Sequence, residues 1–443
     1  MAYQIPQQLE YKEKIMFGLT FKQLAYAFLF GSIAIILFNK INHQILKFTL
    51  ASIPSCLGIC FMFFNLDAII KDYFIYLKQR KIFKYDPRLE KLISVKSIDN
   101  NIIETDKKIA ILNVQAINYS IKPSKEQEAI IQSFQKFLNS IDFPIQILMS
   151  TESLELSDYL TSLKSRIKES NFMELFAKYK KHLQNIISSN KIMNRVFYVI
   201  IPESTNLEIQ LNICMERLEN LNLKVERLST KELKQLLTKF FSGTGKGSLI
   251  NSLSPDYMLN YPTYLNTNKK YCRIIYASGY PRAVEAGFLD RIVSSLGDFD
   301  LSMHIKPYPI ETMLINLNKE LQKQRADLYA MQSKAAINPS LQIQYNDTRK
   351  TLEQLQKGKE KLFNISLYIN CKADSLDELE MLTKRVEAEL NSLMIIPGTA
   401  NLRMLQGFKS MAPLGADELN FDRNITTEAL SAFFPFTSQF SRV

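Results

Sequence analysis

Histidine is scarce in this sequence, and cysteine is not clustered. The three histidines are spread along the chain: His43, His182 and His304. The five cysteines form no CxxC pair and no cluster with histidine: Cys56, Cys60, Cys214, Cys272 and Cys371. The pattern therefore predicts no zinc site, no disulfide framework and no bound cofactor, which suits a reducing cytoplasm. Cys214, Cys272 and Cys371 are expected to be small core residues.

A true phosphate-binding loop is also missing. The segment Gly243–Ser248 reads Gly-Thr-Gly-Lys-Gly-Ser. A P-loop needs GxxxxGK followed directly by Ser or Thr, after a strand and before a helix. Here Gly247 follows Lys246, and the preceding segment is predicted to be helical. We interpret the segment as a flexible loop, and an enzyme that uses it to bind nucleotide is the third and weakest hypothesis.

Groupings of residues typical of catalysis are equally sparse. No Gly-x-Ser-x-Gly elbow occurs. The carboxylate pairs Asp377/Glu378 and Asp417/Glu418 fall in predicted helix or loop surfaces, where solvated charge is the usual role. We therefore predict no catalytic residue and no enzymatic activity for this chain.

Two long apolar runs dominate Phe21–Leu66. The first is Leu24–Phe38 and the second is Phe48–Phe64, with a short polar loop between them. About 20 helical residues are needed to cross a bilayer core of about 30 Å. The runs reach this length if Lys22, Gln23 and Lys47 lie at the interface, and Thr20 is expected to cap the first helix. We predict a transmembrane hairpin whose apolar ends are marked by Phe21, Phe38, Phe48 and Phe64.

Two other interpretations of these runs compete with the membrane hairpin. One is a helical hairpin buried in a soluble core, and the other is a signal peptide. The signal peptide is disfavoured because twenty residues precede the first run and a second run follows at once. Small residues recur four apart at Ala27 and Gly31, and at Ala51 and Ser55. They permit close helix packing, within the hairpin or against another membrane subunit, but chance explains them equally well.

Most cations near the hairpin lie outside its turn, which carries only Lys40, with Lys47 just before the second run. They comprise Lys12, Lys14, Lys22, Lys71, Lys78, Arg80, Lys81, Lys84, Arg88, Lys91 and Lys96. The positive-inside rule then predicts a multi-pass protein of the inner (plasma) membrane with both termini and the soluble body in the cytoplasm. The formal net charge of +11 permits contact with nucleic acid without indicating it. The basic cluster after the hairpin is expected to face anionic membrane lipids.

Strands and amphipathic helices alternate after the hairpin, which predicts an α+β fold. A long helical hairpin is expected at 310–361, and the C-terminal end after Ser392 is expected to be extended. Basic and acidic residues are interleaved along this hairpin, which argues against DNA contact. We predict five segments: a cytoplasmic tail 1–20, the membrane hairpin 21–66, a basic helix and linker 67–106, and two α+β subdomains 107–262 and 263–443.

The N-terminal segment resembles the PrgI-type membrane proteins. The residues that carry the resemblance are Ile5-Pro6 and Gly18-Leu19-Thr20-Phe21-Lys22-Gln23 before two apolar helices. The resemblance covers roughly Ala2–Lys84. These proteins are the small two-helix inner-membrane subunits of conjugative type IV secretion systems, so the resemblance implies an inner-membrane subunit.

The rest of the chain resembles the N-terminal, non-motor domain of the conjugation ATPase family of type IV secretion. The residues that carry it are Tyr280-Pro281-Arg282, Gly287-Phe288-Leu289, Pro307-Tyr308-Pro309 and the segment Thr426–Ser438. This resemblance covers about Lys107–Phe440. In that family a Phe-Pro-Phe-Thr-Ser segment lies just before a RecA-like motor. The present sequence stops at Val443 without a motor, so ATPase activity is not carried over.

The C-terminal aromatic segment has two interpretations. It either packs back on the body or docks a partner, and the resemblance favours docking to a separate motor subunit. The proposed docking residues are Phe433, Phe434, Pro435, Phe436, Thr437 and Ser438.

Taken together, the sequence predicts a membrane-anchored scaffold of a type IV secretion machine for conjugative DNA or protein transfer. Expected partners are a separate ATPase motor, inner-membrane channel subunits, membrane lipids and further copies of the chain. The alternative is a membrane-tethered nucleic-acid-binding protein of DNA uptake or transfer, which would bind single strands in a salt-sensitive way.

Overall fold

A computed structural model describes most of the chain, in two compact units. The described residues are 2–5, 14–16, 19–41, 43–64, 66–79, 82–84, 94–153, 157–166, 170–190, 193–243, 252–268, 270–295, 297–332 and 339–437. One unit, here called the body, comprises Met1–Gln7 and Ile82–Val443. The other, here called the hairpin unit, comprises Gln8–Lys81. The predicted α+β fold is confirmed, with two apolar N-terminal helices and an antiparallel sheet.

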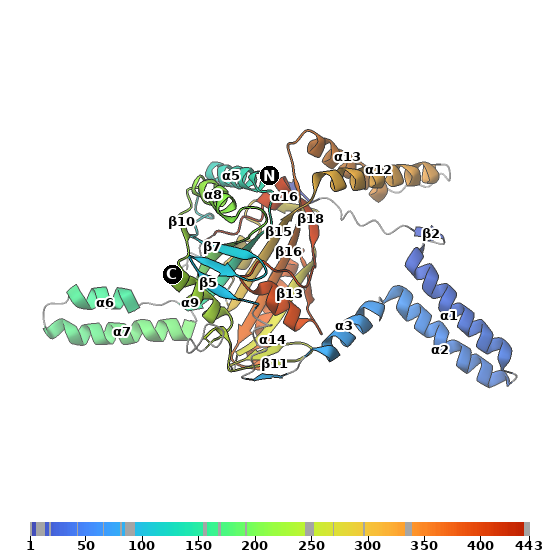
Figure 1. The fold of residues 1–443 in the computed structure, drawn as a ribbon, viewed down its shortest axis with the longest axis horizontal. Coiled ribbons are helices and arrows are strands. Elements are labelled where there is room, and N and C mark those ends of the chain that lie inside the picture. Colours follow the sequence, from blue (N-terminus) through green and yellow to red (C-terminus); the bar gives the residue numbers. More distant parts are fainter. Residues whose placement is uncertain are drawn as a thin grey trace. The chain divides into compact units, whose positions relative to one another are not determined.

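The hairpin unit begins with a small ladder and continues into three helices (Figure 1). Strands β2 (Lys14–Met16) and β3 (Leu19–Thr20) pair with each other. Helix α1 (Phe21–Lys40) packs along helix α2 (Gln44–Phe63), and helix α3 (Leu66–Lys78) follows. The predicted hairpin of two long apolar helices is therefore present.

The body is built on a single 14-stranded sheet. The first set of elements comprises β5 (Ser97–Asp99), β6 (Ile102–Glu104), β7 (Lys108–Val114), α5 (Ser124–Ser140), β8 (Ile145–Ser153), α6 (Ser157–Arg166), α7 (Ser170–Asn190), β9 (Met193–Pro202), α8 (Leu207–Glu219), β10 (Val225–Arg227) and α9 (Thr230–Phe240). In this set β5, β6 and β7 form a meander, and the strand order continues β10-β7-β9-β8 with antiparallel pairing.

The second set repeats this plan. It comprises β11 (Tyr257–Asn260), β12 (Leu265–Thr267), β13 (Lys270–Gly279), α11 (Asp290–Val293), β15 (Phe299–Pro307), α12 (Ile310–Gln332), α13 (Pro339–Gln356), β16 (Leu362–Ala373), α14 (Leu376–Ser392), β17 (Ile396–Thr399) and α15 (Met404–Met411). Again three strands form a meander, β11-β12-β13, and the order continues β17-β13-β16-β15. Each set therefore contains a ferredoxin-like β-α-β-β-α-β arrangement with a two-helix arm inserted between its second and third strands.

The two sets meet where β8 pairs with β15, with Met303 opposite Ile147. This pairing is antiparallel and joins equivalent strands, so the two sets are related by a local pseudo-two-fold axis. The arm α6–α7 follows β8 and the arm α12–α13 follows β15. Because β8 and β15 run in opposite directions, the two arms leave the sheet at opposite ends, as Figure 1 shows.

Helices cover both faces of the sheet, because successive side chains of a strand point to opposite faces and the central strands are apolar on both. On β9, Phe197, Val199 and Ile201 belong to one apolar cluster, while Tyr198 and Ile200 belong to the other. The first face packs against α5, α8, α11, α14 and α16 (Thr427–Ser431). The second face packs against α9 and α15. The sheet is thus the middle layer of three.

Several predicted boundaries differ from those of the structure. The predicted basic helix and linker 67–106 contains the helix α3, but it also contains β4 (Ile82–Lys84), β5 and β6, all part of the sheet. The predicted subdomain boundary near residue 262 lies between β11 and β12, which pair within the same sheet. The C-terminal end is not extended, because it forms α15, β18 (Arg423–Thr426) and α16. The predicted N-terminal tail divides between the two units.

Candidate functional site

The most distinctive surface of the described chain is the apolar hairpin α1–α2. Both helices are long and apolar enough to cross a membrane, and only 6% and 11% of their apolar windows are buried. The four residues that mark the predicted apolar ends, Phe21, Phe38, Phe48 and Phe64, are all exposed. Soluble monomers rarely leave such a large continuous apolar surface open. The alternative of a core hairpin buried in a soluble domain does not fit this exposure.

The two helices contact each other through a few close-packed residues. Ala34, Pro54 and Gly58 are buried in this contact. The rings of Tyr26 and Phe30 lie 5.3 and 5.2 Å from that of Phe61. At the turn, the rings of Phe38 and Phe48 are 5.3 Å apart, and the Lys47 ammonium lies 4.6 Å from the Phe38 ring.

The small residues that the sequence singled out behave differently from Gly58. A Cβ on Gly58 would come within 2.8 Å of the Phe30 Cβ, whereas a Cβ on Gly31 would meet nothing within 4 Å. Ser55 is exposed, and its hydroxyl donates to the Ala51 carbonyl within the same helix (2.9 Å). Gly58 therefore permits the close helix approach, and Gly31 lies on an open face.

Replacement of Gly58 by leucine is expected to separate the helices, because the new side chain would need the space of Phe30. The expected loss of pairing free energy is about 1–3 kcal/mol. Disulfide formation between Phe38→Cys and Phe48→Cys, in full-length protein with Cys56 and Cys60 replaced by alanine, measures the pairing. Gly31→Leu is the matched control and should cross-link like the parent. Equal cross-linking of the Gly58 and Gly31 variants would contradict this packing.

Polar contacts hold the open end of the hairpin. Thr20 caps α1, as predicted, and forms a capping box with Gln23. The Gln23 side-chain amide also donates to the Met62 carbonyl near the end of α2 (3.0 Å). The Lys22 ammonium forms an ion pair with Asp67 at the start of α3 (2.5 Å). The end at which the chain enters and leaves the hairpin is therefore its polar end.

The residues just before the hairpin unit belong to the body. Strand β1 (Ala2–Gln4) pairs with β14 (Ala283–Glu285), and the Ile5 amide donates to the Arg282 carbonyl (2.8 Å). Tyr3 and Ile5 are buried in the core on the first face of the sheet. Strand β1 and Ile5, which the sequence analysis placed in a polar tail, therefore belong to the body, while Pro6 lies outside the described residues.

The segments that resemble the ATPase family meet next to this added strand. The Tyr280 and Phe288 rings lie 5.9 and 5.0 Å from the Phe433 ring. Gly287 has a φ of +74°, and a Cβ there would come within 2.6 Å of the Tyr119 ring. Only glycine adopts this backbone without strain. These motif residues thus have a packing role in the core.

The expected docking surface at the C-terminal end requires a correction. Phe433, Phe434 and Phe436 are completely buried in the core on the first face of the sheet. Pro435 and Thr437 are also buried, and Ser438 lies outside the described residues. The cause is α16, which is capped by Thr426 and packs against α5, so that the chain turns back onto the body. The aromatic residues therefore form core rather than a free docking segment.

A buried polar network lies on the second face of the sheet, around Asp417. This side chain is fully buried; it accepts hydrogen bonds from the Tyr368 hydroxyl (2.7 Å) and Ser366 (2.9 Å), and forms an ion pair with Lys306 (3.3 Å). Burial raises the pKa of Asp417, but His304, Lys306 and the hydrogen bonds outweigh it and lower the pKa to about 2. Asp417 therefore carries its charge at neutral pH.

Two further side chains connect this network to α15. His304 Nε2 lies 2.7 Å from the Ser410 carbonyl, so it must carry a proton and donate it. Burial lowers the pKa of His304, although Asp417 opposes this shift. Gln146 donates to Ser302 (2.9 Å) and to the Ala412 carbonyl (3.0 Å). These bonds fix the segment after α15 against the centre of the sheet.

Two cavities in the body hold mixed charge. The larger, about 610 Å³, is lined in part by Lys306, Lys409, Asp417 and Glu418. There Lys409 pairs with Glu418 (3.0 Å), just as Lys306 pairs with Asp417. Because Lys306 and Lys409 are each paired with an acid, they do not form a cationic site for phosphate.

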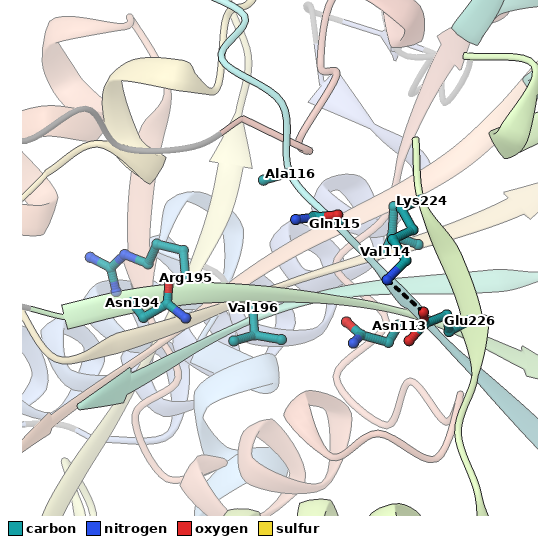
Figure 2. A pocket seen from close by; sticks show the side chains of 9 residues that line it. All are labelled: Asn113, Val114, Gln115, Ala116, Asn194, Arg195, Val196, Lys224 and Glu226. Carbon is teal, nitrogen blue, oxygen red and sulfur yellow. Dashed lines mark ion pairs between the residues drawn. The ribbon is translucent and has the colours of Figure 1, made fainter. Parts of the chain in front are cut away.

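The smaller cavity, about 480 Å³, lies at the ends of β7, β9 and β10 (Figure 2). Figure 2 shows Lys224 and Glu226 facing each other, at 2.9 Å. Arg195, also at this cavity, donates to the carbonyls of Ser295 (2.9 Å) and Gly297 (3.1 Å). Burial lowers the pKa of Arg195 to about 10, so it stays charged. Its guanidinium therefore serves to join the two halves of the sheet.

The remaining predicted residues add no chemistry to these surfaces. Cys214, Cys272 and Cys371 are buried, as predicted, and burial raises the pKa of each thiol. Of the Gly243–Ser248 loop, Gly243 follows α9 and its amide donates to the Thr238 carbonyl, while 244–248 lie outside the described residues. Among the residues that the structure describes, no group of three or more His, Cys, Asp or Glu is placed to hold a metal ion.

Comparison with protein-family models gives one match, at residues 96–243, to the archaeal TraC-like domain. These residues begin just before β5 and end just after α9, so the matched segment coincides with the first of the two structural repeats. A search of curated proteins finds none that matches the chain. The domain match supports a conjugation-related family. It does not reach the N-terminal segment, so the resemblance of that segment to PrgI-type proteins stays a prediction.

Proposed function

We propose that this protein is a membrane-anchored scaffold of a conjugation-related transfer machine and that it docks a separate ATPase motor. The hairpin α1–α2 is the anchor, and the three-layer body is the platform. The TraC-like match supports the conjugation part of this proposal. Inner-membrane channel subunits and further copies of the chain are its expected neighbours.

The observation that carries the proposal is that the chain belongs to the body both before and after the hairpin unit. Strand β1 precedes the hairpin and pairs with β14, while the chain after α3 re-enters the same body at Ile82. A folded body lies on one side of a membrane. The segment between must therefore cross an even number of times, as two exposed apolar helices of 20 residues each would.

Charge supports one orientation. The turn of the hairpin carries Lys40, with Lys47 just inside α2, while the larger number of cations flanks the open end. By the positive-inside rule the open end and the body face the cytoplasm. The Lys22–Asp67 ion pair at the open end also fits the wet side of the interface.

The test is the accessibility of single cysteines in cells that express the full chain with Cys56 and Cys60 replaced by alanine. We expect a membrane-impermeant maleimide to label His43→Cys at the turn from outside. Lys78→Cys should be labelled only after the membrane is opened. Labelling of Lys78→Cys from outside, or of neither site in a membrane fraction, would overturn the proposed anchor and orientation.

The absence of motor activity is tested separately. The purified full chain is expected to hydrolyse ATP no faster than a Lys246→Ala variant does. Hydrolysis that this substitution abolishes would overturn the scaffold proposal in favour of an enzyme. We do not carry the nucleic-acid alternative forward, because it rests on net charge, and both described cavities contain lysines that pair with acids.

A further inference from the structure

Helix α3, directly after the hairpin, exposes an apolar stripe. Five large side chains form it, each between 38% and 58% exposed: Ile69, Ile70, Tyr73, Phe74 and Leu77. Their spacing of one, four, five and eight residues places them on one face of a helix. By the same spacing, Lys71 and Lys78 lie outside the stripe, on the flank next to Phe74. The helix is therefore strongly amphipathic, with its apolar face open.

The length of α3 excludes a third crossing. Thirteen residues rise about 20 Å at about 1.5 Å per residue, and a bilayer core is about 30 Å thick. The helix also carries Asp67 and Asp72, and Asp67 is paired with Lys22 at the open end of the hairpin. The start of α3 is thus held at the level where the hairpin ends.

We propose that α3 lies along the membrane interface, with its apolar stripe between headgroups and acyl chains and its lysines toward anionic lipid phosphates. The proposal rests on the hairpin being a membrane anchor. Helix α3 starts three residues after the last residue of α2, so it continues an apolar surface that already requires lipid. Interfacial helices with an apolar face and basic flanks bind anionic bilayers in this way.

Charge and side-chain type select lipid as the occupant of this face. In the sequence, Arg80 and Lys81 follow Lys78, which adds positive charge to this stretch of the chain. Tyr73, in the stripe, combines an apolar ring with a polar hydroxyl and suits the headgroup level. A second copy of the chain, or the body itself, is the alternative occupant that the test must separate from lipid.

The test measures the depth of single spin labels on the full chain in phosphatidylcholine vesicles that contain one quarter phosphatidylglycerol. Cys56 and Cys60 are replaced by alanine, and one cysteine at a time is placed on α3 or on the exposed faces of the hairpin. We expect the ratio of oxygen to nickel-complex accessibility to be several-fold higher at Phe74→Cys than at Lys71→Cys. Ile70→Cys and Asp72→Cys form a second such pair.

Labels at Leu29→Cys and Ile53→Cys separate the two possible failures. If both hairpin labels lie deep in lipid but Phe74→Cys and Lys71→Cys give equal ratios, α3 is in water and this inference is wrong. If Phe74→Cys is shielded from both reagents, the stripe is covered by protein and the inference is again wrong. If the hairpin labels themselves are open to water, the anchor fails and the inference fails with it.

Discussion

Replacement of Phe434 by alanine is expected to lower the free energy of unfolding of the body by about 3–5 kcal/mol. Its ring is fully buried and lies 5.4 Å from that of Phe134, 5.6 Å from that of Phe436 and 5.9 Å from that of Tyr119. The substitution would leave a large cavity among rings that the surrounding helices hold in place. Urea unfolding of the full chain in detergent micelles, followed by circular dichroism, measures the loss.

The matched control is Phe172→Ala on arm helix α7, where the ring is 52% exposed. Removal of that ring is expected to change stability by less than about 0.5 kcal/mol. The contrast distinguishes a core segment from a docking segment. If the C-terminal aromatics docked a motor and were otherwise free, Phe434→Ala and Phe172→Ala would have equally small effects on stability.

The burial of these rings also shows why the sequence could not decide whether the C-terminal segment packs on the body or docks a partner. Four aromatic residues near a chain end have no local element that buries them, so periodicity leaves packing and docking open. The ring partners of Phe433, Phe434 and Phe436 include Tyr119, Phe134, Phe197 and Phe288, which are far away in the sequence. Only the tertiary fold brings these rings together.

Local signals in the sequence were reliable where they were strong. Helix α5 (Ser124–Ser140) follows a strong local signal, because Ile131, Phe134 and Phe137 repeat on one face. Thr20 caps α1 because a hydroxyl followed by Gln three residues later forms a capping box. The predicted long helical hairpin at 310–361 is likewise present, as α12 and α13.

Short strands and the repeated architecture were missed. Strands β5, β6, β11 and β12 contain three or four residues each, too few for a period-two signal. The duplication is visible only in strand order, since β10-β7-β9-β8 and β17-β13-β16-β15 place equivalent strands alike. The TraC-like match covers the first repeat, and the second repeat shares its topology over residues 257–411.

Replacement of Asp417 by alanine is expected to cost the body about 3 kcal/mol at neutral pH. The substitution leaves the Tyr368 and Ser366 hydroxyls and the Asn420 amide without their acceptor, and it leaves Lys306 without its counter-charge. Lys306 is 38% exposed, so water recovers part of its loss and the cost stays below that of a fully buried pair. Urea unfolding at pH 7 measures the effect.

The pH dependence gives the sharper result. The folded-state pKa of Asp417 is lowered to about 2, below its usual value of 3.8. Its stabilising contribution is therefore complete above about pH 4 and is lost as the pH falls toward 2. The stability difference between the parent and Asp417→Asn, which keeps the shape without the charge, should shrink over this range. Because Asp417 opposes the lowering of the His304 pKa, both proteins carry His304→Gln, which removes the coupled titration of His304 from the comparison. A difference that stays constant from pH 7 to pH 3 would mean that the charge of Asp417 does not hold the segment after α15 against the sheet, and hydrogen-bond geometry alone would then account for the network.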